Sequence, residues 1–191
     1  MTTQRSTTDK TEAISAAVAL AEFRADIAIQ RTPLPRVNSD DSYLVRAEDV
    51  AWYTPSGTNP ARLGPVLASP MKTFELFLQE FGPGESSDMQ QHHHEAVHVV
   101  VSGHGHSEIE DAVVAWGPGD FICVPTMHWH RHYNDSADEG VRMLLVENSR
   151  LLDSLGLNYR VSAGFVTWDE HRRTLQDDQQ RSGRAPMSKG Y

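Results

Sequence analysis

Two short segments of this chain concentrate imidazole side chains. The first, Gln91 to His106, has the sequence QHHHEAVHVVVSGHGH, and the second, Pro125 to Asn134, has the sequence PTMHWHRHYN. Most of the ten histidines of the chain lie between His92 and His132. Neutral imidazole is a common ligand of divalent transition metals, and histidine changes its charge near neutral pH. The clustering therefore indicates metal binding or proton transfer more than packing.

The first segment contains the five residues His94 to His98, HEAVH, which match the H-E-x-x-H pattern of zinc peptidases. That pattern requires a helix, because only residues four apart on one helical face bring both imidazoles to one ion. The three valines Val99 to Val101 before Gly103 favour a strand, since β-branched residues suit pleated backbone better than helix. A peptidase is therefore a disfavoured alternative, in which Glu95 would be the catalytic base.

If these segments are strands, the histidines are arranged differently than on a helix. Alternate residues of a strand lie on the same face, and each segment has three histidines of one parity. These are His92, His94 and His98 in the first segment, and His128, His130 and His132 in the second. Two antiparallel strands that each present imidazoles inward can supply three or four nitrogen ligands to one divalent ion.

The rest of the chain predicts an all-β domain with flanking arms. From Met71 onward, short β-branched and aromatic runs are separated by turn signals such as Gly82-Pro83-Gly84, which is typical of a small antiparallel sandwich or barrel. We expect an N-terminal helix over residues 11–29 and a wrapping arm within residues 1–70. The barrel should occupy residues 71–150, and residues 151–191 a C-terminal extension whose tail, from about Arg172, is disordered or grips a partner.

Composition narrows the partners and the location. The net charge of −9 and the pI near 5.5 argue against nucleic acid and against an anionic membrane surface. No apolar run is long enough to span a bilayer, and the N-terminus lacks a signal-peptide core. The single cysteine, Cys123, excludes an internal disulfide. We therefore expect a cytoplasmic protein whose partner is a small molecule.

The two histidine segments together resemble the two motifs of the cupin superfamily. In the first motif, His92, His94 and Gly105 match, and His98 stands where a glutamate is usual. In the second motif the glycine, proline, histidine and asparagine positions match, while Met127 replaces an inner glycine; the matching residues are Gly119, Pro125, His130 and Asn134. The resemblance covers about residues 71–147. It implies a cupin (double-stranded β-helix, or jelly-roll) barrel with a metal inside.

Within that superfamily, the second motif looks most like that of gentisate 1,2-dioxygenases and salicylate dioxygenases. Those enzymes lack the first-motif glutamate and hold Fe(II) with three histidines, which the resemblance carries over to His92, His94 and His130. The chain departs from them in having one recognisable cupin unit where two are usual. His98 is a fourth candidate ligand, and its alternative role is that of a wall residue beside the site.

Further candidates follow from parity and position. His128 and His132 share the inward parity of His130, so either is a candidate catalytic proton shuttle. Phe77 and Gln79 share parity on an earlier strand and are candidate walls of the substrate pocket. His104 and His106, beside the glycines that follow the first strand, are candidate pocket residues as well.

These observations predict an Fe(II) dioxygenase that uses O2 to cleave a hydroxylated aromatic acid or a similarly activated carbon–carbon bond. An anionic substrate suits such a site, because three neutral imidazoles leave the charge of the ion uncompensated. The alternative enzyme is a non-oxidative cupin that holds Zn, Mn or Ni and acts as a cyclase, isomerase or lyase. A ligand-binding cupin without turnover is a third hypothesis. The N-terminal arm and the cupin resemblance also favour a homodimer.

Overall fold

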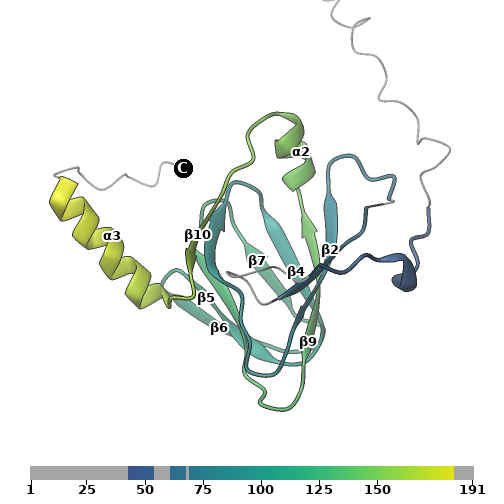
Figure 1. The fold of residues 1–191 in the computed structure, drawn as a ribbon, viewed down its shortest axis with the longest axis horizontal. Helices are drawn as coiled ribbons and strands as arrows, with labels where there is room; N and C mark the ends of the chain where they lie inside the picture. The colour runs from purple at the N-terminus through teal and green to yellow at the C-terminus, as the bar shows by residue number, and fades with distance from the viewer. Residues whose placement is uncertain (1–42, 54–60, 68, 183–191) are drawn as a thin grey trace, which may run out of the picture. The chain divides into compact units, whose positions relative to one another are not determined.

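The computed structural model describes residues 43–53, 61–67 and 69–182, all of which belong to one unit of the chain, residues 42–191. The helix predicted over residues 11–29 and the end of the chain beyond Ser182 lie outside these ranges. The described residues form two five-stranded sheets in which every pairing is antiparallel (Figure 1). The expectation of an all-β antiparallel barrel is confirmed.

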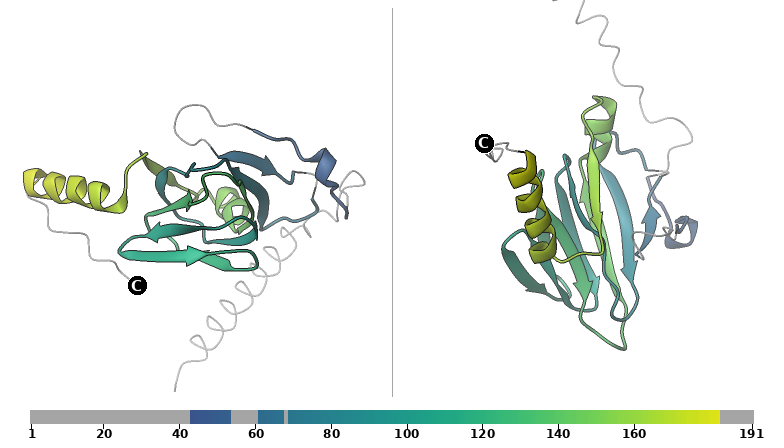
Figure 2. Two further views of the ribbon diagram at one scale, coloured as in Figure 1. Left: turned by 90° about the horizontal axis from the view of Figure 1, so that it is seen from below. Right: turned by 60° about the vertical axis from the view of Figure 1, so that its left-hand side comes forward.

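The first sheet has the strand order β1-β2-β9-β4-β7, and the second has the order β10-β3-β8-β5-β6. The strands of the first sheet are β1 (Arg62–Pro65), β2 (Glu75–Phe81), β9 (Val141–Glu147), β4 (Ala96–Ser102) and β7 (Phe121–Val124). Those of the second are β10 (Arg160–Gly164), β3 (Met89–His92), β8 (His130–Asn134), β5 (Gly105–Ile109) and β6 (Ala112–Trp116). The two sheets face each other as the walls of a barrel (Figures 1 and 2).

Strand β4 decides between the two interpretations of the first histidine segment. Ala96, His98 and Val100 are buried, and the residues between them are more exposed, which is the period of two that a strand with one buried face shows. Glu95 precedes the strand and is exposed, and its backbone N–H donates to Oδ1 of Asn148. The pattern HEAVH therefore does not lie on a helix, and the H-E-x-x-H peptidase alternative is wrong.

The apolar core fills one end of the barrel. Phe81 of β2 stands opposite Val141 of β9, and Val100 of β4 stands opposite Met143. The full buried cluster is Ala61, Phe81, Val100, Trp116, Ile122, Val141, Met143 and Leu145. Toward the other end of the same strands the inward positions include the polar residues Gln79 of β2, His98 of β4 and Glu147 of β9. The barrel thus has a dry end that stabilises it and a polar end where the histidines lie.

The barrel extends beyond the predicted boundaries of residues 71 and 150. Strand β1 lies before the first boundary and pairs with β2, and β10 lies after the second and pairs with β3. A one-turn 3-10 helix, η1 (Ala47–Asp49), precedes β1, and helix α2 (Ser149–Ser154) follows β9. The segment counted as a C-terminal extension therefore contributes a strand to the second sheet.

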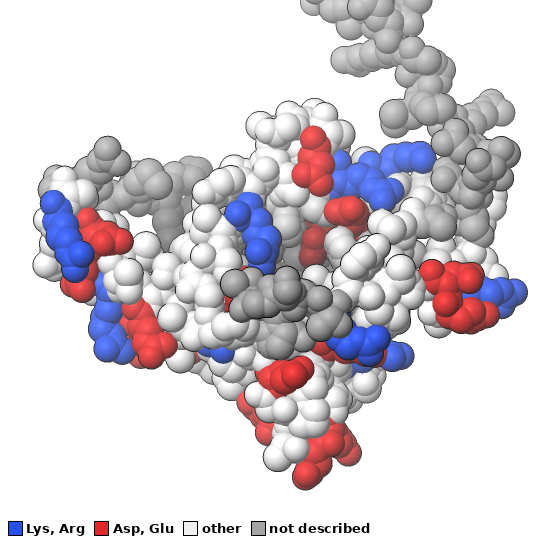
Figure 3. Space-filling view, viewed as in Figure 1, with Lys and Arg blue, Asp and Glu red and all other residues white. Residues whose placement is uncertain are grey.

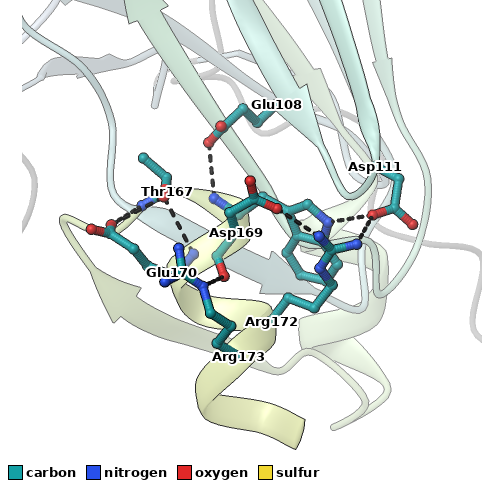
Figure 4. Close-up of polar contacts among 8 residues, drawn as sticks. Glu108, Asp111, Thr167, Asp169, Glu170, Arg172 and Arg173 are labelled. Carbon is teal, nitrogen blue, oxygen red and sulfur yellow. Dashed lines mark hydrogen bonds and ion pairs between the residues drawn. The ribbon is translucent and has the colours of Figure 1, made fainter.

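Helix α3 (Trp168–Ser182) follows β10 and extends away from the barrel (Figures 1 and 2). Its first turn is fastened to the β5–β6 hairpin (Figure 4): the Trp168 N–H donates to Glu108, and the Trp168 indole and Arg172 both donate to Asp111. The indole of Trp129 packs on the ring of His171. Residues 172–182 are thus helical, so the tail that was expected to be disordered or to grip a partner from about Arg172 is not disordered as far as Ser182.

The surface agrees with the modest charge of the chain. On the face drawn in Figure 3, Lys and Arg side chains are interspersed with Asp and Glu, and the residues coloured there form no continuous basic area. Within the described residues, no helix has the length and apolar character needed to cross a bilayer.

Candidate metal centre

Five of the predicted histidines lie together inside the polar end of the barrel. They are His92, His94, His98, His130 and His132, and each is less than 9% exposed. Their rings form a connected group: His92 lies 3.6 Å from His94 and 4.7 Å from His130, and His132 lies 4.4 Å from His98 and 5.5 Å from His130, between ring centroids. The two sequence segments thus meet, although the single strand expected for the first one is divided: His92 ends β3 in the second sheet, His94 lies in a bend, and His98 is on β4 in the first sheet.

Three of these rings have the same hydrogen-bond arrangement. Nδ1 of His92 lies 2.7 Å from the carbonyl oxygen of His94, and Nδ1 of His130 lies 2.9 Å from that of His128. Nδ1 of His94 lies 3.1 Å from Oδ1 of Asn158. Each of these oxygens only accepts, so each Nδ1 carries the proton and donates it, which leaves the lone pair on Nε2. This arrangement is the one that fixes metal-binding imidazoles in proteins.

The donor set fits a divalent ion, although the rings do not yet converge on one point. Within the described ranges, no three His, Cys, Asp or Glu side chains are placed to hold a metal ion together. The rings of His92 and His94 are stacked, 8° from parallel. The lone pairs of two stacked, nearly parallel rings point along separate planes and do not converge on one ion at a bond length of about 2.1 Å, so one ring must rotate on binding. Nε2 of His130 is buried and has no partner among the described residues, as a ligand atom would without its ion.

Burial keeps these imidazoles neutral, which metal binding requires. Burial and the neighbouring His94 lower the pKa of His92 to about 4. Burial also lowers the pKa of His94, against the opposing effect of its hydrogen bond to Asn158. Complete burial holds the pKa values of His98, His130 and His132 well below their ordinary range, and the neighbouring imidazoles add to the effect. Near pH 7 the metal-free cluster is therefore a group of uncharged rings.

A cavity of about 130 Å³ opens beside the histidines. Its walls come from both sheets: Leu63, Phe77, Gln79, Gln90, His92, His94, His98, Leu145, Glu147 and Arg160. Phe77 and Gln79 thus line it, as their parity on β2 predicted. Gln79 is 3% exposed, and its Oε1 has no hydrogen-bond partner among the described residues. The cavity therefore offers a buried, unused acceptor as well as apolar walls.

Glu147 and Arg160 are two charged residues of this cavity that the sequence analysis did not identify. Burial, and secondarily the charge of Glu75, raise the pKa of Glu147 to about 7. Glu147 follows Met143 and Leu145 at the inward parity of β9, so the alternation of VRMLLVE could have identified it. Arg160 donates to the buried Asp88 at 2.8 Å and to Gln90 at 2.6 Å. It lies on β10, outside the motifs, where no local signal marked it.

The remaining predicted site residues lie elsewhere. His104 is exposed between β4 and β5, and His106 lies on the outer face of β5, where it stacks on Tyr133 and bonds Asp135 at 2.7 Å. His128 is half-buried in the turn before β8, with Nδ1 bonded to the carbonyl oxygen of Thr126. None of these three is part of the cavity lining. The structure therefore does not bring them into the cluster.

A larger hollow of about 560 Å³ lies at the opposite end of β2, β4 and β9. It is lined by Arg62, Glu80, Phe81, Gly82, Glu85, Ser102, Gly140, Val141 and Arg142. Its charged side chains neutralise one another, because Glu80 pairs with both Arg62 and Arg142. It contains no histidine, so the smaller cavity is the one placed for chemistry.

Known proteins share this architecture. Residues 77–147 match the Cupin domain family. The chain is 22% identical to a cupin-2 domain protein from Rhodospirillum rubrum of known crystal structure, with a TM-score of 0.53 over 73% of this chain and 90% of that one. At this identity the likeness concerns the fold alone.

Enzymes of known activity also resemble the sequence, two of them as follows. The 5-aminosalicylate 1,2-dioxygenase of Comamonas sp. is 31% identical over 106 residues, which are 56% of this chain and 26% of the dioxygenase. The 1-methylthio-D-xylulose 5-phosphate methylsulfurylase of Rhodospirillum rubrum is 34% identical over 77 residues, which are 40% of this chain and 49% of that enzyme. The matched region thus spans half or less of either relative, and the two catalyse different reactions.

Proposed function

We propose that this chain, whose residues 77–147 form a cupin domain, is a metal-dependent enzyme that uses O2 to cleave a small hydroxylated aromatic acid. One observation carries the proposal: His92, His94 and His130 each donate Nδ1–H to an oxygen and keep a lone pair on a buried or nearly buried Nε2. These three residues would hold the ion, for which Fe(II) is the expected identity. When bound, such an ion supplies Lewis acidity and electron transfer toward O2.

The cavity supports a monocyclic substrate. Its volume of about 130 Å³ is close to the roughly 150 Å³ of an apolar protein cavity that accepts benzene. Phe77, Leu63 and Leu145 would contact the faces and edge of a ring. A substrate with two fused rings would need the walls to move.

Two polar groups of the cavity support a substrate that is both hydroxylated and anionic. The guanidinium of Arg160 is held by Asp88 and Gln90, and it lines the cavity, where it would bind a carboxylate. The unpartnered Oε1 of Gln79 would accept a hydrogen bond from a hydroxyl group. Glu147, with a pKa of about 7, is suited to accept or donate a proton beside the ring.

The resemblance to the methylsulfurylase favours a second candidate, a non-oxidative cupin enzyme that holds Zn, Mn or Ni. Both candidates use the same histidines, and they differ in the need for oxygen. For either one, a homodimer and a cytoplasmic location stay predictions.

Reconstitution without oxygen separates the two candidates. The metal-free protein is loaded anaerobically with Fe(II), Mn(II), Zn(II) or Ni(II), and then given monocyclic hydroxybenzoates with and without O2. The proposal expects stoichiometric oxygen uptake and loss of the aromatic absorbance with Fe(II) alone. Turnover without oxygen uptake would support the second candidate, and no turnover with any of the four metals would contradict both.

A further inference from the structure

A buried hydrogen-bond chain leads from the wall of the barrel toward the histidine cluster. The indole Nε1 of Trp116 lies 2.8 Å from Oγ of Ser107, and Oγ of Ser107 lies 2.7 Å from Nδ1 of His132. All three side chains are buried, and Ser107 and His132 are completely so. These hydrogen bonds join β6, β5 and β8, three neighbouring strands of the second sheet.

A glycine of the first motif keeps Trp116 in place. Gly105 stands opposite Trp116 in the β5–β6 pairing. A Cβ at position 105 would lie 2.6 Å from the Trp116 ring and 1.9 Å from the carbonyl oxygen of Tyr133. Position 105 therefore excludes any side chain, and the indole uses this space to reach Ser107.

Because Trp116 can only donate, it determines which atom donates and which accepts in each of these hydrogen bonds. An indole N–H only donates, so Ser107 Oγ accepts from Trp116. The Ser107 hydroxyl has a single proton of its own, and His132 Nδ1 is the acceptor that the described residues provide for it. Nδ1 of His132 is therefore unprotonated, and the neutral ring carries its proton on Nε2. This tautomer is the opposite of the one that His92, His94 and His130 adopt.

Two buried nitrogens without a partner in the described part of the protein lie in the two rings beyond Ser107. Nε2 of His132 and Nδ1 of His98 are both buried and lack a hydrogen-bond partner among the described residues. The two rings are neighbours, with centroids 4.4 Å apart and planes tilted by 46°. A buried donor and a buried acceptor are costly when both stay unpaired, so a ring rotation that joins them is favourable.

We propose that Trp116, Ser107, His132 and His98 form a one-way chain that ends in the Nε2–H of His98 at the cavity. His98 is then a positioning residue that donates a hydrogen bond to an anionic ligand, and it does not bind the metal. The inference rests on the proposed function in that the cavity holds an anion beside the ion. It assigns a role to the histidine that occupies the usual glutamate position.

The tautomers can be measured in the metal-free protein. Long-range ¹⁵N–¹H correlation spectra of protein labelled with ¹⁵N-histidine at pH 8 report which nitrogen of each ring carries the proton, and single His→Gln variants assign the signals. We expect protons on Nε2 of His98 and His132, and on Nδ1 of His92, His94 and His130. A proton on Nδ1 of His98 would overturn the proposal.

Ser107→Ala tests the direction of the chain without touching a histidine. Without the hydroxyl donor, His132 and His98 should each become mixtures of both tautomers. Ser87→Ala is the matched control, because Ser87 is equally buried but accepts from the backbone N–H of His132 and not from its ring. Unchanged tautomers of His98 and His132 in Ser107→Ala would overturn the proposal.

Metal affinity tests the part of the proposal that says His98 does not bind the metal. Co(II) titrations of the metal-free protein should show His98→Gln within about tenfold of the unmodified protein, and His92→Gln weakened well beyond 100-fold. Equal losses for the two variants would make His98 a ligand. None of these readouts depends on turnover, so a failure of the proposed dioxygenase activity would leave them interpretable.

Discussion

Oε2 of Glu147 lies 3.3 Å from Nε2 of His94, at the nitrogen that a metal ion would bind. Because His94 donates Nδ1–H to Asn158, this Nε2 is an acceptor. The pKa of Glu147 is raised to about 7, mainly by burial, so below pH 7 its protonated carboxyl group would be positioned to donate to His94. In the metal-free protein, Glu147 therefore competes with an ion for the same lone pair.

Metal affinity should consequently depend on pH through Glu147. Below pH 7 an ion must displace the Glu147 proton, so the affinity for Co(II) should weaken about fivefold between pH 7 and 6 and approach a loss of about tenfold per pH unit below that. Above pH 7 the carboxylate is ionised and the affinity should level off. Titrations at pH 6, 7 and 8 measure this slope. Glu147→Gln should abolish it, and an unchanged slope in that variant would contradict the assignment.

The stability of the metal-free protein should fall as the pH drops below 6.5. Burial lowers the pKa of His92 to about 4, and it also lowers the pKa values of His94, His98, His130 and His132. At mildly acidic pH the unfolded chain therefore binds more protons than the folded chain. Each such histidine contributes about 1.4 kcal/mol per pH unit between its unfolded and folded pKa values. Glu147, whose pKa is raised, acts in the opposite direction between pH 4.5 and 7, but it offsets only one histidine.

Urea unfolding at pH 7, 6 and 5 in the presence of a chelator measures this profile. His132→Gln should make the free energy of unfolding depend less steeply on pH, whereas replacement of the exposed His104 by Gln should leave this dependence unchanged. A profile that is flat between pH 7 and 5 would contradict the neutral, buried cluster.

Arg160 should determine the affinity for a carboxylate ligand. Arg160→Met should weaken the binding of a hydroxybenzoate to the metal-loaded protein by about 10- to 100-fold, because a charge-assisted hydrogen bond contributes roughly 1.5–3 kcal/mol. Arg160→Lys keeps a cation beside Asp88 and should give an intermediate loss. Arg142→Met is the matched control, since its side chain is similarly exposed but pairs with Glu80 in the other hollow. Calorimetric titration measures the affinities, and equal effects of Arg160→Met and Arg142→Met would contradict the role.

The second motif contains a residue that is strained for a physical reason. Met127 has φ of +58°, and its N–H donates to the carbonyl oxygen of His92, which ties the two histidine segments together. A side chain in this left-handed region costs roughly 1–2 kcal/mol, which explains why the motif has glycine there. Met127→Gly should therefore raise the free energy of unfolding by about 1 kcal/mol in urea titrations. A loss of stability would show that the Met127 side chain contributes packing that outweighs the strain.

Strand parity predicted the burial of His98, His130 and His132, but it also placed His128 inward, and His128 lies in the turn before β8, outside the cluster. The alternation holds along β4, where His98 is buried, but the single strand expected to carry both His92 and His98 is two strands of different sheets, with His94 in the bend between them. The same rule applied to β9 would have included Glu147, and applied to β5 it would have placed His106 outside, because Gly105 and Ser107 are the buried residues there.

Other features depend on pairings that no local pattern encodes. Arg160 reaches the cavity because β10 pairs with β3 across some 70 residues of sequence. Asn158, which orients His94, comes from the same distant region. The tautomer of His132 depends on Trp116, which is brought to Ser107 by the β5–β6 pairing and by the space above Gly105. These contacts require the three-dimensional register of both sheets.

The central claim is that Nε2 of His92, His94 and His130 binds a divalent metal. Its most direct test is the metal content of protein loaded anaerobically with Fe(II) and then passed through a desalting column, compared with His92→Gln, His130→Gln and the exposed-site variant His104→Gln. The account predicts one iron per chain in the unmodified protein and in His104→Gln, and less than about a tenth of that in the other two variants. Iron retained at one per chain in His130→Gln, or absent from the unmodified protein, would contradict it.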